Sequence, residues 1–508
     1  MKAWIRIPRC SLVDIACLVV PVWLAIMVSR TSADADLWGH LRFGADLLAG
    51  HGLSAADPYS FTADTPWVNH EWLSELVLAA FYRGAGAFGL NLLKLAVIAL
   101  IGLLTWRTAE RHGGSPFALT VLTTLVAFAS YTRTQVLRPQ LFSALLFTLL
   151  LVLLEWRAHR KGAPGGHRSL AAWIVVPALF CVWANAHGAW IVGFATLAVW
   201  VAFDVLEERS ASALVQGSTL LLASAAATLV NPYGAGNWEF LRRTVGLSRD
   251  DITDWTPFAK FPWWLIAFEL VLPVIALLAM RRCRRWPPAR HAAIIGVLAF
   301  GTYRVGRVDA FLQIAIGLLL APIFIEFLVR VERALRERPR LGTPSRLHGS
   351  VAVAIVIITA GFGATRLGHI YVDGDWTPDP EAVRFLRAHS TNTKLLTWFD
   401  WGEYAIWHLS PAGIRVSMDG RRETVYSERM LADHWAFYRN RGEALEFPEA
   451  IGADQIWLPK RLPIVPVLRN RGWHALFESD DSVVLSRDAQ PTLIAAAAHP
   501  ALIFFPGP

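Results

Sequence analysis

The residues best suited to chemistry lie in the heptapeptide DADLWGH, residues 34–40, which directly follows the first apolar segment. Asp34 and Asp36 are two residues apart, and His40 follows four residues later. Two carboxylates at this spacing can share a divalent cation, or one can act as a base while the other orients it. Oxygen ligands with one histidine suit Mg²⁺ or Mn²⁺ better than Zn²⁺. The alternative is that these acids only end an apolar helix where lipid meets water.

A second polar group opens an amphipathic segment at residues 70–83 that would lie on the membrane surface. His70 and Glu71 begin this segment, and Glu75 follows one turn later. The sequence HEWLSE lacks the HExxH spacing of zinc proteases, which disfavours that class. Acids at a helix start are stabilised by the helix dipole, so a structural role is the alternative. In the functional interpretation, His70 and Glu71 line the same outer cavity as the DADLWGH motif.

Four arginines form the third set, at predicted outer ends of helices: Arg133, Arg138, Arg304 and Arg307. A guanidinium group can hold a phosphate with its fork of N–H donors. The alternative is that these side chains only reach from the apolar region to the interface.

The elements that position these residues belong to a membrane protein. The chain has 508 residues, of which 54% are hydrophobic and 17% charged, against about 25% charged residues in average soluble domains. This excludes a disordered chain and disfavours an ordinary soluble enzyme. A membrane-spanning helix needs about 20 apolar residues. Eleven segments approach this length: 12–30, 88–106, 117–132, 140–155, 170–186, 188–204, 212–230, 263–280, 291–303, 310–329 and 350–366. We interpret the first as a retained helix, because no clear signal-peptide cleavage site follows it.

The distribution of basic residues orients these segments. With the N-terminus in the cytoplasm, the inner connections contain 21 Lys and Arg residues and the outer connections before the last segment contain 10. The positive-inside rule favours this orientation, and eleven crossings would place residues 367–508 outside. Because the basic residues lie in short loops rather than on one folded surface, nucleic acid is excluded as a partner.

The last part of the chain reads as a small α/β domain with 14 basic and 18 acidic residues. Helices are expected at 379–389 and 426–440, and strands at 394–399, 414–419, 455–459 and 482–486. Residues 419–421, Asp-Gly-Arg, are expected to form a strand-end turn. The fold class predicted is therefore an α-helical polytopic membrane protein with a C-terminal α/β extracytoplasmic domain. Its parts are 1–366, with the outer loop 31–87, then 367–490 and an apolar tail at 491–508.

Several motifs resemble a known protein class: DADLWGHLRFG after the first helix, DPYSFTADTPWVNHEWLSE in the following loop, then RPQLF, WANAHG, LVNPYG, WFDWGEY and MDGRRETVY. Together they resemble the GT-C class of polytopic membrane glycosyltransferases, among them the dolichyl-phosphate-mannose-type and lipopolysaccharide-sugar transferases of bacteria. The resemblance implies inverting transfer of a sugar from a polyprenyl-phosphate donor at the outer face. It also implies that Asp34 or Asp36 is a base or metal ligand. One departure is that Gln140 stands where many relatives carry a second acid.

The function expected is that of a membrane hexosyltransferase in the bacterial cytoplasmic membrane. The acceptor would be an envelope glycan, lipid or protein, and Asp34 and Asp36 would act in catalysis or hold Mg²⁺ or Mn²⁺. His40, His70 and Glu71, with the four arginines, would bind substrate. Two alternatives remain open: a transporter or flippase for a lipid-linked glycan, supported only by Lys94 and Glu269 within predicted spans, and a non-catalytic envelope assembly protein.

Overall fold

The computed structural model describes residues 9–54, 56–161, 170–245, 255–374, 376–487, 494–495 and 503–507. The chain divides into two compact units, each built from three separate stretches. The helical unit comprises Met1–Thr31, Phe88–Asn231 and Leu247–Gly368, and the mixed unit comprises Ser32–Ala87, Pro232–Gly246 and His369–Pro508. The loop that follows the first helix therefore belongs with the C-terminal part of the chain.

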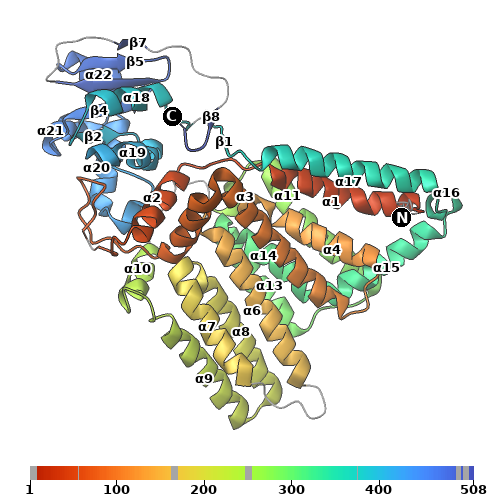
Figure 1. Ribbon diagram of the computed structural model, residues 1–508. Helices are drawn as coiled ribbons and strands as arrows, with labels where there is room; N and C mark the ends of the chain where they lie inside the picture. The colour runs from red at the N-terminus through yellow and green to blue at the C-terminus, as the bar shows by residue number, and fades with distance from the viewer. Residues whose placement is uncertain are drawn as a thin grey trace. The chain divides into compact units, whose positions relative to one another are not determined.

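Apolar helices account for the helical unit (Figure 1). They are α1 (Leu12–Ser29), the second part of α3 (Trp72–Glu110), α4 (Pro116–Ala129), α5 (Tyr131–Thr134), α6 (Gln140–Lys161), α7 (Leu170–Ala186), α8 (Trp190–Glu208), α9 (Ala211–Ala227), α11 (Trp263–Glu269), α12 (Val271–Cys283), α13 (Ala289–Arg304), α14 (Asp309–Leu319), α15 (Ala321–Arg336), α16 (Pro339–Gly342) and α17 (Arg346–Arg366). Each apolar segment predicted from the sequence contains a helix.

Side chains that lipid would cover distinguish these helices from those of a soluble bundle. In α17 only 6% of the most apolar 18-residue stretch is buried within the protein, and Ile358 is 70% exposed. Among the described residues, six helices are long and apolar enough to span a membrane, or seven if the bent pair of α14 and α15 forms one span. The chain is therefore a multi-pass membrane protein, while the count of eleven crossings stays a prediction.

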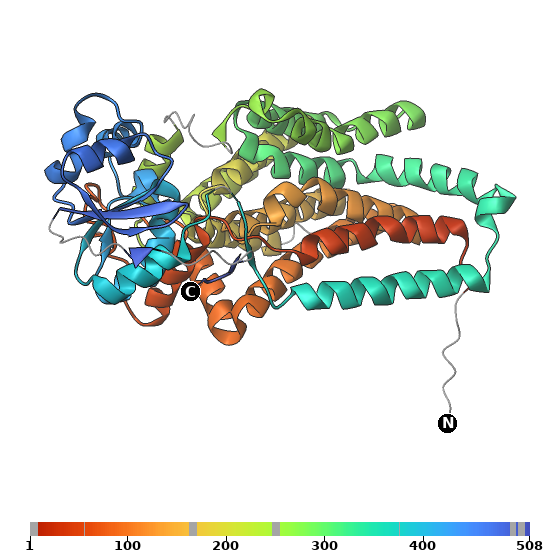
Figure 2. The same cartoon turned by 90° about the horizontal axis from the view of Figure 1, so that it is seen from above.

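Helix α1 shows how the sequence sets a helix end. Ser11 Oγ accepts a hydrogen bond from Asp14 N at 3.2 Å, and Asp14 Oδ2 accepts one from Ser11 N at 2.8 Å. This capping box satisfies N–H groups that the first turn cannot pair internally. Helix α1 packs along α17 (Figures 1 and 2), although the two are far apart in the sequence.

Helix α3 is two helices joined by a sharp break. It begins at Trp72, so the predicted amphipathic segment 70–83 is indeed helical. Ala85 and Gly86 then depart from helical geometry, with φ of 57° and ψ of −142° at Gly86. Glycine adopts this backbone conformation readily because it has no Cβ. The break separates the part of α3 in the mixed unit from the part in the helical unit.

A six-stranded mixed sheet lies at the centre of the mixed unit, in the order β3-β2-β4-β6-β5-β7. Strand β2 is parallel to β3 and β4, whereas β6 is antiparallel to β4 and β5. The strands are β2 (Lys394–Thr397), β3 (Arg415–Val416), β4 (Gln455–Pro459), β5 (His474–Glu478), β6 (Ser482–Ser486) and β7 (Ile494–Ala495). The sequence predicted β2, β3, β4 and β6, and it missed β5 and β7.

The mixed unit also contains helices, among them a segment from the first loop. They are α2 (Leu37–Leu48), α10 (Gly236–Val245), α18 (Pro380–His389), α19 (Gly402–Leu409), α20 (Glu428–Tyr438), α21 (Phe447–Ala450) and α22 (Ile464–Asn470). Helix α2 packs against α19. The loop also extends the sheet edge, because Val416 N donates to Tyr59 O at 2.9 Å and Phe61 N donates to Val416 O at 3.0 Å.

The apolar tail contributes two short strands. β7 pairs with β5, and β8 (Ile503–Phe504) pairs with β1 (Tyr371–Val372). Pro506 O then accepts hydrogen bonds from Trp38 Nε1 at 2.7 Å and from His408 Nε2 at 2.8 Å. In its described residues the tail is therefore part of the mixed unit. Residues 488–493 and 496–502 lie outside the described part of the chain.

Candidate functional site

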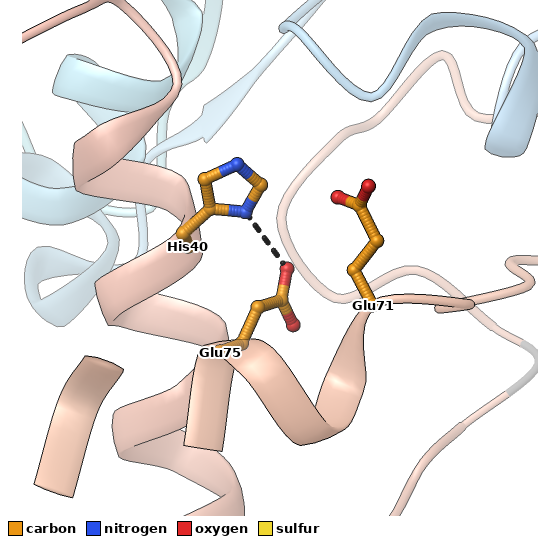
Figure 3. Close-up of side chains that lie close together, drawn as sticks. All are labelled: His40, Glu71 and Glu75. Carbon is orange, nitrogen blue, oxygen red and sulfur yellow. Dashed lines mark hydrogen bonds and ion pairs between the residues drawn. The ribbon is translucent and has the colours of Figure 1, made fainter. Parts of the chain in front are cut away.

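Three side chains of the first loop converge in the mixed unit: His40 on α2, Glu71 just before α3, and Glu75 in its first turn (Figure 3). One ligand atom from each residue lies within 4.8 Å of the other two. One nitrogen and two carboxylate oxygens form a donor set that a divalent metal ion can use. Glu71 and Glu75 are four residues apart, a spacing that places two side chains on one face of a helix. This spacing is the feature of the sequence that indicates Glu75 as a member of the cluster.

Hydrogen bonds hold this cluster in place. His40 Nδ1 lies 3.1 Å from Glu75 Oε1, and Asn69 Nδ2 donates to Glu75 Oε2 at 2.6 Å. Burial disfavours the charged imidazolium of His40, but the hydrogen bond to Glu75 and the charges of Glu71, Glu75 and Asp36 raise its pKa to about 9. The cluster therefore attracts positive charge, either a proton on His40 or a cation.

His70 lies at the border of this cluster. Its Nε2 is 3.5 Å from Glu71 Oε1, and its ring stacks on Phe240 with ring centroids 4.7 Å apart. His70 thus orients Glu71 while its own ring is fixed by an aromatic neighbour.

Asp36 immediately precedes α2 and faces a buried acid that the sequence did not single out, Glu403 of α19. Any side chain at Gly420 would collide with Asp36 Oδ1 and with Glu403 Oε1, so both carboxyl groups border the same space. Gly39 likewise leaves room for Glu403 Oε2. The carboxyl ends of the parallel strands β2 and β3 bring α19 and Gly420 to one edge of the sheet, where α/β sheets commonly place ligands.

The surroundings of Glu403 favour its protonated form. The residue is 3% exposed, and its Oε2 atom has no hydrogen-bond partner in the described part of the chain. Burial, followed by the charges of Asp36 and Asp419, raises the pKa of Glu403 well above its usual value. The carboxyl group of Glu403, which borders the same space as Asp36, therefore holds a proton more readily than an exposed glutamate does. No local motif marks Glu403, because its environment depends on long-range packing.

Asp34 also lies in this region, at the end of the connection from α1. Its backbone oxygen accepts from Leu37 N at 3.3 Å, and both of its carboxylate oxygens are buried. The three-donor cluster contains neither aspartate of the DADLWGH motif. The structure thus brings together His40 and Glu71 from the predicted set, adds Glu75, and places Asp36 beside Glu403.

Arg421 balances charge next to these acids. Its Nη1 and Nη2 donate to Asp57 at 2.6 and 2.9 Å, and its Nε and Nη2 donate to Asp419 at 2.8 and 2.7 Å. The guanidinium carbon also lies 4.7 Å from the ring centroid of Trp67. Burial opposes ionisation of Asp419, but Arg421 holds the pKa of Asp419 below its usual value. The turn after β3 is therefore an ion-paired link between the first loop and the sheet.

The four predicted phosphate-binding arginines belong to the helical unit, and their environments differ. Arg133 Nε donates to Asp309 at 3.0 and 3.1 Å, so its charge is already balanced. Arg307 lies over the ring of Trp255 at 5.1 Å, Arg138 is half-buried and Arg304 is exposed.

The two charges within the predicted spans have local partners. Lys94 Nζ donates to Thr31 Oγ1 at 2.6 Å and to Arg30 O at 3.2 Å. Glu269 accepts from Thr132 Oγ1 and from Gln313 Nε2, both at 2.9 Å. These hydrogen bonds give each charge a structural role, which weakens the only support for a transporter.

Comparison with known proteins supplies the class of the fold. No protein-family model matches the sequence, and no curated protein matches it. Among solved structures, the archaeal oligosaccharyltransferase AglB from Archaeoglobus fulgidus, in complex with an inhibitory peptide and a dolichol-phosphate, is similar with a TM-score of 0.57 and 12% identity over 88% of this chain and 69% of that chain. The same oligosaccharyltransferase in complex with Zn and sulfate matches with a TM-score of 0.51 and 11% identity over 87% and 68%.

A second similar protein matches over nearly its whole length. ArnT from Cupriavidus metallidurans, bound to undecaprenyl phosphate, has a TM-score of 0.56 and 13% identity over 94% of this chain and 98% of that chain. At identities this low, the similarity establishes the fold alone. The role of each site residue is argued from its own geometry. The resemblance noted in the sequence is confirmed at this level: the chain has the fold of the GT-C class of membrane glycosyltransferases.

Proposed function

We propose that this protein transfers a sugar from a polyprenyl-phosphate donor to an acceptor at the outer face of the bacterial cytoplasmic membrane. The observation that carries the proposal is the fold shared with ArnT bound to undecaprenyl phosphate, over almost the full length of both chains. AglB bound to a dolichol-phosphate supports the same class of lipid. An envelope glycan, lipid or protein would be the acceptor.

The acids of the mixed unit suit such a reaction. An acceptor hydroxyl attacks the anomeric carbon, the bond from that carbon to the phosphate oxygen breaks, and polyprenyl phosphate leaves. Asp36 would take the hydroxyl proton as general base. Glu403 would remain protonated beside it, because its burial and acidic neighbours raise its pKa. A single displacement of this kind inverts the anomeric centre.

A divalent cation fits the cluster of His40, Glu71 and Glu75. The imidazole nitrogen and the two carboxylates form a mixed donor set, and the crystal structure of the archaeal oligosaccharyltransferase with Zn and sulfate makes a metal plausible chemistry for this fold. When bound, the cation would neutralise negative charge on the donor phosphate. Binding would replace the proton of His40, and Asn69 would keep Glu75 oriented.

Arginines of the helical unit would hold the donor phosphate. The candidates for this role are Arg133, Arg138, Arg304 and Arg307, of which Arg133 forms an ion pair with Asp309. The orientation that serves this site has the N-terminus in the cytoplasm and the mixed unit outside.

The test uses the full-length chain in nanodiscs, a radiolabelled polyprenyl-phosphate sugar and an envelope extract as acceptor, together with glycan analysis of cells. We expect Asp36→Asn to lower the transfer rate by about 10²- to 10⁴-fold, the usual contribution of a general base. Asp433→Asn is the matched control, since Asp433 is a half-exposed acid on α20 of the same unit.

The outcomes separate the proposed roles. Full transfer by Asp36→Asn would show that Asp36 is not the base. If deletion of the protein removes no sugar from any envelope component, the transferase proposal is wrong, and an assembly or transport role takes its place.

A further inference from the structure

Several buried N–H groups in the mixed unit lack acceptors among the described residues, and three of them belong to two side chains near one aromatic ring. Two belong to Arg422, at Nε and Nη1, and the third is Nε1 of Trp435. Arg422 is only 9% exposed. Its single ion-pair neighbour in the described part of the chain is the adjacent Glu423, whose Oε2 lies 3.7 Å from Arg422 Nε, beyond hydrogen-bond distance.

Both side chains lie near the same aromatic ring. The guanidinium carbon of Arg422 lies 5.6 Å from the ring centroid of Phe399, and the ring of Trp435 lies 5.7 Å from the same centroid. Phe399 follows β2, Arg422 follows β3, and Trp435 belongs to α20. The carboxyl ends of the parallel strands therefore gather residues that are distant in the sequence.

The neighbouring arginine shows what a purely structural arginine looks like here. Arg421 donates four hydrogen bonds to Asp57 and Asp419, whereas Arg422 is almost as buried and leaves two donors unused. A buried donor without a partner costs about 1–3 kcal/mol. Arg422 also has a φ of 44°, in the left-handed region that side chains other than glycine rarely adopt. Such unfavourable features cluster at active sites and ligand-binding sites.

The chemistry of the group restricts its ligand. Three N–H donors, two of them on a guanidinium group, favour acceptor oxygens with negative charge, because charge-assisted hydrogen bonds are the stronger ones. Phe399 and Trp435 are both half-buried, and their remaining exposed ring atoms offer apolar area for the C–H groups of a sugar ring. We propose that Arg422, Trp435 and Phe399 bind an acidic sugar, whose phosphate or carboxylate accepts from the unused donors.

If the proposed transferase function holds, this site makes the acceptor an acidic glycan. The binding site itself does not depend on that function, because it is measured without donor lipid or transfer.

The test is saturation-transfer NMR on the full-length chain in nanodiscs, with glucose 6-phosphate, glucuronate and glucose as probes. We expect a signal from at least one of the two acidic probes and none from glucose; which acid responds identifies phosphate or carboxylate as the oxyanion. Arg422→Gln should abolish this signal, and Trp435→Phe should weaken it several-fold because it removes one donor and keeps a ring. Arg429→Gln is the matched control, since Arg429 is an arginine of α20 whose side chain is 92% exposed.

A second variant separates binding from folding. Without ligand, Arg422→Met should unfold at the same or a higher temperature than the wild type, because it removes unpaired buried donors. Equal signals from Arg422→Gln and the wild type, or no signal from either acid, would overturn the proposal. A lower unfolding temperature of Arg422→Met would also overturn it, by showing that Arg422 is structural. Loss of transfer in the separate Asp36→Asn assay bears only on the proposed function.

Discussion

At the scale of single residues, environment rather than residue type decides the role of each charge. Arg421 and Arg422 are adjacent, yet Arg421 has four hydrogen bonds to two carboxylates and Arg422 has unused donors. Asp36 and Glu403 border the same space, yet burial and neighbouring charge raise the pKa of Glu403 well above its usual value. These differences come from partners far away in the sequence.

Replacing Arg421 with Met should strongly destabilise the mixed unit. Asp57 and Asp419 have fully buried side chains and would keep their charges without a partner. Removing one member of a buried ion pair typically costs about 3–5 kcal/mol of unfolding free energy. Denaturant unfolding of the solubilised full chain measures the change. Arg429→Met, at a side chain that is 92% exposed, is the control and should change the free energy by less than about 0.5 kcal/mol.

Buried neutral histidines should make the mixed unit less stable in acid. Burial lowers the pKa of His408 to about 4, although its hydrogen bond to Pro506 O opposes this shift. Above pH 6.5 His408 is neutral in both the folded and the unfolded chain, so its contribution to the free energy of unfolding is fully present. As the pH falls from 6.5 to 4, only the unfolded chain takes up the proton, which costs about 3 kcal/mol. Burial likewise lowers the pKa of His434 to about 4.

Unfolding free energies measured between pH 7.5 and 4 test this expectation. His408→Asn should show a shallower loss of stability over this range than the wild type, whereas His474→Asn, at an exposed position on β5, should follow the wild type. Identical slopes for His408→Asn and the wild type would show that His408 is not held neutral.

At the scale of elements, three helices from distant parts of the chain build the candidate site. Helix α2 supplies His40 and follows Asp36, the first turn of α3 supplies Glu75, and α19 supplies Glu403. The packing of α2 on α19 depends on Gly39, since a side chain there would collide with Glu403.

Removal of one ligand should weaken metal binding by the His40 cluster. We expect Glu75→Gln to reduce the affinity for Mn²⁺ by about 10- to 100-fold, since it removes a carboxylate ligand and the partner of His40. Titration calorimetry of the chelator-treated full chain measures this affinity. Glu110→Gln is the control, because Glu110 is an exposed acid at the other end of α3. Unchanged Mn²⁺ affinity in Glu75→Gln would remove the cluster from consideration as a metal site.

At the scale of the whole molecule, the division into two units matches a division of environments. The helical unit exposes apolar side chains that lipid must cover, whereas the mixed unit contains a sheet with a net acidic C-terminal segment. The first loop belongs to the mixed unit although it lies between two apolar helices in the sequence.

Cysteine labelling tests the predicted orientation. In a variant whose four native cysteines are replaced by alanine, we expect Arg429→Cys to react with a membrane-impermeant maleimide in intact cells, and Arg338→Cys to react only after lysis. The excess of basic residues in the predicted inner connections is the physical reason. The reverse pattern would place the candidate site in the cytoplasm and would contradict transfer at the outer face.

The sequence by itself determined the class of the molecule and most of its elements. Apolar runs of spanning length require helices because lipid offers no hydrogen bonds to the backbone, and every predicted run contains one. The strand patterns of the sequence likewise predicted β2, β3, β4 and β6 of the C-terminal sheet. The DADLWGH and NHEW motifs indicated His40 and Glu71 as candidate site residues. The spacing of Glu75 from Glu71 also indicated Glu75. Only the tertiary structure decided that Glu403 lies beside Asp36, that Asp309 balances Arg133, and that Arg421 and Arg422 differ. Burial and charge balance depend on which distant side chains meet, and no local pattern in the chain encodes that.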